Sequence, residues 1–245
     1  MKAMVLAAGL GTRLRPLTND RPKALVEVNG RTLLEITLER LRSFGIHEVI
    51  VNTHHFAEMI PAYLKKHHNF GMSIEISHED LLLDTGGGLK KTAWFFLEDA
   101  QERRPFVLHN VDVLSTIDVA RMARFHAQSG ALATMAVQPR PTSRPLLFDK
   151  DGQLRARGSD PEKTGVQGGW EALAFSGIHV ISPRIFSVLS ETGAFSIIDA
   201  YLRLANDGER INAFRADEYA WRDLGRPEDI AEAARQLARG PSSAL

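Results

Sequence analysis

The chain has 245 residues, of which 44% are hydrophobic and 24% are charged, and its formal net charge is +0. This length fits one domain with a modest lobe. The absence of a net charge gives no electrostatic reason to expect a nucleic-acid partner. The chain contains no cysteine, which excludes disulfides, thiolate nucleophiles and cysteine-based zinc sites.

The first residues superficially resemble a signal peptide, because Met1 and Lys2 precede an apolar run. Gly9, Gly11 and two arginines follow, however, without a small-residue cleavage site. No apolar run approaches the length of a transmembrane helix. We therefore expect a soluble, cytoplasmic protein without a membrane partner.

The first half of the chain alternates short apolar runs with segments of helical periodicity. The patterns predict strands at 3–6, 49–51, 72–77, 106–110 and 131–137, an extended segment at 22–28, and helices at 32–44, 56–66, 89–98 and 117–128. Such alternation predicts a parallel sheet that is covered by helices on both faces.

The second half changes character at 139–170, where prolines and glycines are frequent and Asp151-Gly152 predicts a hairpin turn. Beyond it we predict strands at 173–181, broken at Gly177, and at 211–214 and 218–221. Helices are predicted at 183–189, 196–205 and 227–239. The predicted fold class is α/β, with a doubly wound, mostly parallel sheet.

The loop after the first strand reads Leu6-Ala-Ala-Gly-Leu-Gly-Thr-Arg-Leu-Arg-Pro-Leu-Thr18. Gly9 and Gly11 permit a tight turn whose N–H groups can face an anion. Thr12 adds a hydroxyl donor, and Arg13 and Arg15 add positive charge. The loop is therefore typical of a phosphate-binding site.

Other readings of this loop remain open. A dinucleotide-binding fingerprint needs glycine where Leu14 stands, and Pro16 interrupts the helix that should follow. The Gly-Lys-Ser/Thr of the other phosphate-binding loop is absent. A simple turn is the remaining alternative.

Two aspartates are candidate Mg²⁺ ligands, since Mg²⁺ favours one or two carboxylates together with substrate phosphates. Asp112 follows an apolar strand, where a helix-capping role is equally consistent. Asp223 lies near the last helix, where a turn aspartate is the alternative. Lys23 is a candidate phosphate partner or a surface lysine.

The segment Thr85-Gly-Gly-Gly88 precedes a predicted helix. Its missing side chains would let a flat ring or a phosphate approach the backbone, and a flexible connector is the alternative. Ligands of open α/β sheets bind beyond the carboxyl ends of the strands. We therefore expect this segment, the first loop and Asp112 to share one edge of the sheet.

The first loop, together with Arg21-Pro-Lys-Ala-Leu25, resembles the signature of the sugar-1-phosphate nucleotidyltransferases. The resemblance covers nearly the whole chain, since it continues through Asp84-Thr-Gly-Gly-Gly88, Asn110-Val-Asp112, Phe175-Ser-Gly-Ile178 and Trp221-Arg-Asp-Leu-Gly225. Within the family, the chain is most similar to short N-acetylmuramate-1-phosphate uridylyltransferases, and mannose- or heptose-1-phosphate guanylyltransferases are similar too.

The resemblance implies a single nucleotidyltransferase domain without a C-terminal β-helix. A Rossmann-like nucleotide-binding half would span about 1–130, a smaller sugar-binding lobe about 131–225, and a last helix about 227–239. The implied substrates are a nucleoside triphosphate and a sugar 1-phosphate. The implied reaction depends on Mg²⁺ and releases pyrophosphate to give a nucleotide-diphosphate sugar. The first expectation is uridylyl transfer to an N-acetylmuramate- or hexosamine-type 1-phosphate.

The resemblance also implies roles for individual residues. Arg13, Lys23 and Asp112 would be catalytic, with Arg13 on the pyrophosphate and Lys23 on the α-phosphate. Asp112 and Asp223 would hold Mg²⁺, and Asp223 would lie with Glu171 and Gly177 at the sugar phosphate. The remaining nucleotide-binding residues would be Leu6, Ala7, Ala8, Gly9, Gly11, Thr12, Thr85, Gly86, Gly87, Gly88 and Asn110.

One residue departs from the family pattern: Val111 stands where a glycine usually precedes the metal aspartate. Alternatives therefore stay open, namely guanylyl transfer to mannose- or heptose-1-phosphate and a catalytically degenerate nucleotide or sugar sensor. A dinucleotide-dependent oxidoreductase is disfavoured by Leu14 and Pro16. Monomer and dimer are both consistent with the sequence.

Overall fold

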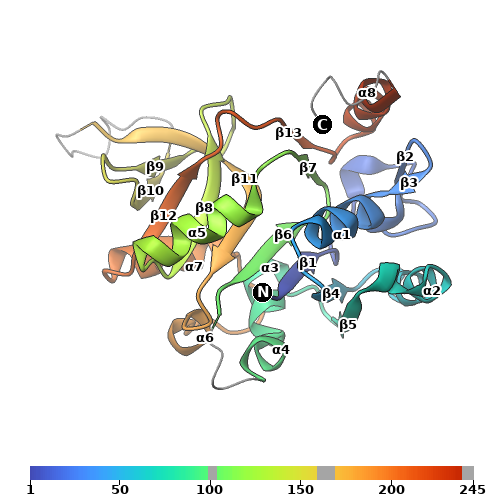
Figure 1. Ribbon diagram of the computed structural model, residues 1–245, viewed down its shortest axis with the longest axis horizontal. Coiled ribbons are helices and arrows are strands. Elements are labelled where there is room, and N and C mark those ends of the chain that lie inside the picture. Colours follow the sequence, from blue (N-terminus) through green and yellow to red (C-terminus); the bar gives the residue numbers. More distant parts are fainter. Residues whose placement is uncertain (99–103, 159–168, 239–245) are drawn as a thin grey trace. The chain divides into compact units, whose positions relative to one another are not determined.

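The computed structural model describes residues 1–98, 104–158 and 169–238, and Figure 1 labels its elements. The chain forms two compact units, each assembled from segments that are separate in the sequence. Unit 1 comprises Met1–Asp84, Leu108–Ile117 and Tyr219–Leu245, and unit 2 comprises Thr85–Val107 and Asp118–Glu218. Within the described ranges, no helix is long and apolar enough to cross a bilayer.

Unit 1 is built on parallel strands. β1 (Ala3–Leu6) pairs with β4 (Glu48–Thr53), and β4 pairs with β5 (Ser73–His78), both in parallel. The end of β6 (Phe106–Asn110) neighbours β1 on its other side. Apolar side chains such as Val5, Ile50 and Leu108 are fully buried in this sheet, as expected for parallel strands.

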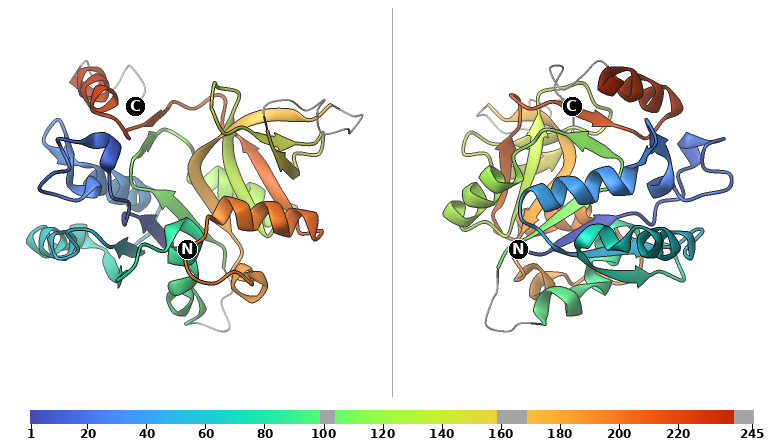
Figure 2. Two further views of the ribbon diagram at one scale, coloured as in Figure 1. Left: turned by 180° about the vertical axis from the view of Figure 1, so that it is seen from behind. Right: turned by 45° about the vertical axis from the view of Figure 1, so that its right-hand side comes forward.

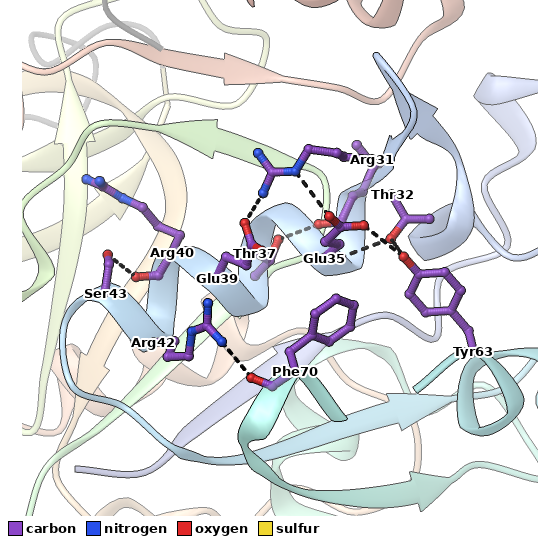
Figure 3. Close-up of polar contacts among 11 residues, drawn as sticks. Arg31, Thr32, Glu35, Thr37, Glu39, Arg40, Arg42, Ser43, Tyr63 and Phe70 are labelled. Atoms are coloured by element: carbon purple, nitrogen blue, oxygen red, sulfur yellow. Dashed lines mark hydrogen bonds and ion pairs between the residues drawn. The ribbon is translucent and has the colours of Figure 1, made fainter. Parts of the chain in front are cut away.

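Among its described residues, unit 1 contains the α-helices α1 (Leu33–Ser43), α2 (Met59–Lys66) and α8 (Pro227–Ala238). Figure 3 shows how polar side chains connect the first two. The Thr32 hydroxyl caps α1 by accepting from the Glu35 N–H at 3.1 Å and donates to the Tyr63 hydroxyl at 3.1 Å. Tyr63, on α2, in turn donates to the Glu35 carboxylate at 2.9 Å. The cap thus fixes both the start of α1 and its position against α2.

A short 3-10 turn, η3 (His68–Gly71), connects α2 to β5. Its four residues all have left-handed φ values, from 50° at His68 to 70° at Gly71, which is uncommon for non-glycine residues. The Arg42 guanidinium donates to the Phe70 carbonyl at 2.8 Å (Figure 3), and the rings of His67 and Phe70 stack at 5.3 Å. These contacts hold the reversal that returns the chain to the sheet.

Unit 2 has a mixed sheet. β8 (Ala133–Gln138) pairs in parallel with β12 (Ile211–Arg215) and antiparallel with the long β11 (Glu171–Ile181). The hairpin of β9 (Leu146–Phe148) and β10 (Leu154–Arg157) is joined to β11 through β9. Gly177, with φ 76°, lies where the pairing of β11 with β8 shifts register between Phe175 and His179, so the predicted interruption is confirmed.

The described helices of unit 2 are α3 (Asp84–Lys91), α4 (Ala93–Leu97), α5 (Val119–Ser129), α6 (Ile185–Val188) and α7 (Ile197–Asn206). The first residue of α3, Asp84, is the last residue of its segment of unit 1. Figure 2 shows the chain from two further sides. The predicted α/β class, with a mixed, mostly parallel sheet and helices, is confirmed. The described residues include no β-helix.

Three local predictions were wrong. The glycine segment does not precede a helix, because α3 begins at Asp84 and contains the segment. The Gly86 N–H donates to the Phe195 carbonyl at 2.9 Å, and this hydrogen bond offsets the poor helix propensity of glycine. The segment predicted as extended at 22–28 contains a 3-10 turn, η2 (Lys23–Leu25). The strand predicted at 218–221 is instead β13 (Trp221–Asp223), which takes its register from a partner strand. The last residue of the predicted helix 227–239 lies outside the described residues.

Candidate functional site

The loop after β1 depends on glycine at one position in particular. Gly11 has φ 63°, and a Cβ there would lie 2.9 Å from the Thr18 methyl carbon and 3.2 Å from the Lys23 Cβ. The Thr18 hydroxyl also donates to the Gly11 carbonyl at 2.8 Å. At Gly9, by contrast, a Cβ would meet no atom of the described residues within 4 Å. Gly11 therefore serves the conformation of the loop, whereas the space beside Gly9 is open.

The backbone before Gly9 is held from the sheet. The Asn52 side-chain oxygen, at the end of β4, accepts from the Ala7 N–H at 2.7 Å and from the Ala8 N–H at 3.3 Å. Both N–H groups are thus satisfied inside the protein. Thr12 is exposed and begins the 3-10 turn η1 (Thr12–Leu14), whose last residue, Leu14, is buried. The Leu6 carbonyl accepts from the Val111 N–H at 3.2 Å.

An ion pair joins two sequence-distant parts of unit 1. Lys23 lies on η2, and its ammonium group is bonded to the carboxylate of Asp112, which follows β6. The two side chains are 13% and 17% exposed, so both charges are mostly removed from water and interact more strongly than a surface pair.

Asp223 reaches the same place through a short antiparallel ribbon. β13 pairs with β7 (Val113–Ser115), so that Asp223 stands opposite Val113, and the Leu224 N–H donates to the Asp112 carbonyl at 2.8 Å. Burial, and then the negative charge of Asp112, raise the pKa of Asp223. Its Oδ1 atom is buried and has no hydrogen-bond partner among the residues that the structure describes.

Arg13 completes the charged cluster. A Cβ placed on Gly225 would lie 2.8 Å from the Arg13 guanidinium and 2.8 Å from Asp223 Oδ1. Both side chains therefore border the bare face of Gly225. Unit 1 thus gathers two cations and two carboxylates, Arg13, Lys23, Asp112 and Asp223, which we call the charged cluster.

The carboxylates of the charged cluster fit a Mg²⁺ ion. Asp223 offers a buried oxygen without a hydrogen-bond partner among the described residues, and Asp112 offers a carboxylate that is paired with the Lys23 ammonium group. The described residues contain no group of three or more His, Cys, Asp or Glu side chains arranged for a metal. Phosphate and water oxygens would supply the remaining ligands, as is usual for Mg²⁺.

Val111 is accommodated without strain. Its side chain is buried, its N–H donates to Leu6, and its carbonyl accepts from the Thr37 hydroxyl at 3.4 Å. Its φ is not positive, so the backbone at this position does not require glycine. Asn110, before it, ends β6 and is half-buried.

The glycine segment lies in unit 2 and is largely used for packing. Gly86 and Gly87 donate to the Phe195 carbonyl at 2.9 and 3.4 Å, and a Cβ on Gly86 would lie 2.2 Å from the Phe195 ring. The Thr85 hydroxyl accepts from the Ile197 N–H at 3.0 Å, and Gly88 is buried in α3. The first glycine of the segment is therefore covered by Phe195.

The predicted sugar-side residues also lie in unit 2. Glu171 begins β11, is exposed and pairs with Arg215, and Gly177 forms the irregularity of the same strand. Unit 1 thus brings together the charged cluster and the first loop. That Thr85–Gly88 shares an edge with them stays a prediction.

Sequence reasoning missed two buried polar residues of unit 1. Asn52 and Glu79 are 2% and 1% exposed, and neither was singled out. The available signal was an asparagine at the end of a buried apolar strand, since polar side chains in such places need internal partners.

The family model described as nucleotidyl transferase matches residues 2–240. The chain is 33% identical to the N-acetylmuramate alpha-1-phosphate uridylyltransferase of Caulobacter vibrioides, with 96% of each chain covered. It is 29% identical to the D-glycero-alpha-D-manno-heptose 1-phosphate guanylyltransferase of Aneurinibacillus thermoaerophilus, with 97% of this chain and 98% of the relative covered. Longer relatives also match, and the chain spans 63% of the length of one of them.

Among solved structures, HddC from Yersinia pseudotuberculosis complexed with GMP-PN superposes with a TM-score of 0.74 at 21% identity. The match covers 96% of this chain and 99% of that one. At this identity the likeness concerns the fold.

Proposed function

Because this chain belongs to the nucleotidyl transferase family and is a sugar-1-phosphate nucleotidyltransferase, we propose that it transfers a uridylyl group from UTP to an N-acetylmuramate- or hexosamine-type 1-phosphate. The Caulobacter relative named for uridylyl transfer supports this choice of substrates. The observation that carries the proposed chemistry is the charged cluster beside the glycine loop.

The proposed reaction is a substitution at phosphorus. An oxygen of the sugar phosphate forms a bond to the α-phosphorus of UTP, and the bond from that phosphorus to the bridging oxygen of pyrophosphate breaks. The attacking oxygen is already ionised at neutral pH, so no general base is needed. Positioning and neutralisation of charge are then the main contributions of the protein.

The charged cluster provides both contributions. Lys23 would contact the α-phosphate, and Arg13, bordering the open face of Gly225, would neutralise the departing pyrophosphate. Asp112 and Asp223 would hold Mg²⁺, which supplies Lewis-acid polarisation of the phosphate oxygens when bound. Gly9, Gly11 and Thr12 would offer backbone and hydroxyl donors to the triphosphate.

The remaining assignments complete the proposal. The backbone of Leu6–Ala8, with Thr85–Gly88 and Asn110, would contact the nucleoside. Glu171 and Gly177 on β11 would face the sugar. We also propose that the chain is a single enzyme domain with a nucleotide-binding and a sugar-binding part. It would act in the cytoplasm as a monomer or a dimer.

Guanylyl transfer to a mannose- or heptose-1-phosphate is the second candidate. The relative from Aneurinibacillus thermoaerophilus, similar over nearly its full length, supports it. A nucleotide or sugar sensor has no comparable support, because a sensor does not need both carboxylates of the charged cluster.

The test is a matrix of the four nucleoside triphosphates against a panel of sugar 1-phosphates, with release of pyrophosphate as the readout. We expect release only when UTP, Mg²⁺ and an N-acetylmuramate- or hexosamine-type 1-phosphate are all present. Asp112→Asn should remove turnover while the protein stays folded. Higher turnover with GTP and mannose- or heptose-1-phosphate would establish the second candidate instead.

A further inference from the structure

A buried row of polar groups connects the first loop to the end of the segment that follows β5. The Asn52 side-chain oxygen accepts from Ala7 and Ala8, and its amide nitrogen donates to Glu79 Oε1 at 2.8 Å. Glu79 Oε2 accepts from the Leu83 N–H at 2.9 Å. All of these residues belong to unit 1.

The backbone on both sides of the row is fixed as well. The Glu79 N–H donates to the Thr53 carbonyl at 2.8 Å, and the Glu79 carbonyl lies 2.8 Å from the His54 ring nitrogen Nδ1. Glu79 is therefore anchored at its main chain and at both carboxylate oxygens, although no step of the proposed reaction uses it.

The hydrogen bonds of this row run in one direction only. Both oxygens of Glu79 accept, so Asn52 must turn its NH₂ group toward Glu79 and its oxygen toward the loop. The opposite amide orientation would place the NH₂ group against the N–H groups of Ala7 and Ala8, and the oxygen against a carboxylate. Each buried donor or acceptor that is left unpaired carries the full cost of its removal from water. Glu79 thus determines the orientation of Asn52.

We propose that Asn52 and Glu79 are positioning residues that hold the Ala7–Ala8 backbone in the conformation that binds the nucleotide. The inference rests on the proposed function, in which Leu6–Ala8 contacts the nucleoside. With the two N–H groups drawn toward Asn52, the loop is ordered before the ligand arrives, so binding does not have to include the cost of ordering it. The pair therefore acts on nucleotide affinity and much less on the chemical step.

A pair of single variants and their combination test this direction of hydrogen bonding. Asn52→Asp places a second carboxylate beside Glu79, and Glu79→Gln places amide hydrogens against the Leu83 N–H or against Asn52. In Asn52→Asp/Glu79→Gln, the aspartate accepts from Ala7, Ala8 and the glutamine NH₂, and the glutamine oxygen accepts from Leu83. All hydrogen bonds of the row are then restored, and the negative charge lies at position 52 instead of position 79.

We expect each single variant to raise the KM for the nucleotide and its calorimetric Kd by about 10-fold or more, since one unpaired buried group costs that much. The double variant should return both within about 3-fold of the wild type, and kcat should change little throughout. Thr53→Val is the matched control, because the buried Thr53 hydroxyl has no hydrogen-bond partner in the described part of the chain. The nucleotide affinity of this variant should equal that of the wild type.

The outcomes separate the two proposals. If the wild type neither binds nor turns over any nucleotide, the proposed function fails. If the wild type is active and the single variants match it, or the double variant is no better than they are, the positioning role is overturned. Should both single variants unfold, the double variant decides: a folded protein with near-wild-type nucleotide affinity supports the inference, and its failure to fold or bind overturns it.

Discussion

The ammonium group of Lys23 is paired with the carboxylate of Asp112, 89 residues further along the chain. Lys23 thereby neutralises one of the two carboxylates assigned to Mg²⁺. A triphosphate that attracts Lys23 would release Asp112 at the same moment. The pair would therefore link the proposed phosphate site to the proposed metal site.

We predict that Lys23→Met raises the affinity of the nucleotide-free protein for Mn²⁺, because Asp112 then has no competing cation. The same variant should lower turnover by about 100-fold or more, since one positioned charge is lost from the reacting phosphates. Electron paramagnetic resonance titration of Mn²⁺ measures the first effect. The exposed Lys66→Met is the control, and unchanged Mn²⁺ affinity in Lys23→Met contradicts the link.

Gly225 provides the second prediction, because Arg13 and Asp223 both lie 2.8 Å from the position of its missing Cβ. Its φ lies outside the left-handed region, so alanine is compatible with the backbone, and the fold should survive. Gly225→Ala should displace the guanidinium and lower turnover by about 100-fold, as misplacements of roughly 1 Å do.

A double-mutant cycle identifies the route of this effect. If Gly225→Ala acts through Arg13, it should cost much less in an Arg13→Ala background than in the wild type. Equal losses in both backgrounds would place the effect elsewhere, for example at Asp223. Thermal unfolding of each variant verifies that the comparison is made on folded protein.

Local signals in the sequence were sufficient for most of the fold. β1 and β6 occupy the predicted residues, and α1 lies one residue inside its predicted range at both ends. Continuous apolar runs and helical periodicity encode these elements directly. The glycine-rich start of α3 was missed because its helical conformation depends on Phe195, more than 100 residues away.

The candidate site was less accessible to sequence reasoning. The ribbon that brings Asp223 beside Asp112 has three residues in each strand, too few for a periodic pattern, and its strands are over 100 residues apart. Residue patterns alone left Asp223 as a turn aspartate, and only the family resemblance paired it with Asp112. Asn52 and Glu79 were missed because their meaning lies in mutual contacts that no local spacing reveals.

Asp223 gives a third prediction that opposes stability to activity. Its pKa is raised by burial and by Asp112, so its neutral form is favoured in the folded protein, and the stabilisation this provides is lost as the pH rises through its folded pKa. Above that pH, keeping this carboxyl group in the folded protein is a net cost to the fold. Asp223→Asn should therefore raise the thermal stability at pH 7 and abolish Mg²⁺-dependent turnover.

The control for this variant is Asp217→Asn, which removes an exposed carboxylate paired with Arg215. Surface pairs of this kind contribute little, so its stability should stay the same or fall slightly. A lower stability of Asp223→Asn at pH 7 would falsify the assignment of Asp223 as an unfavourable buried charge.

The last prediction concerns the acid stability of unit 2. His126 is 3% exposed, lies 2.9 Å from the Thr134 hydroxyl through Nδ1, and burial lowers its pKa from 6.5 to about 4. The unfolded chain takes up this proton near pH 6.5, whereas the folded protein takes it up near pH 4. The contribution of His126 to the free energy of unfolding is therefore complete above pH 6.5. It falls by up to about 3 kcal/mol as the pH is lowered toward 4.

His126→Gln, which can keep the bond to Thr134, should flatten the fall in the free energy of unfolding between pH 6.5 and 4, measured by denaturant titration. The exposed His55→Gln should leave it unchanged, and a wild-type slope in His126→Gln would show that the histidine does not titrate on unfolding.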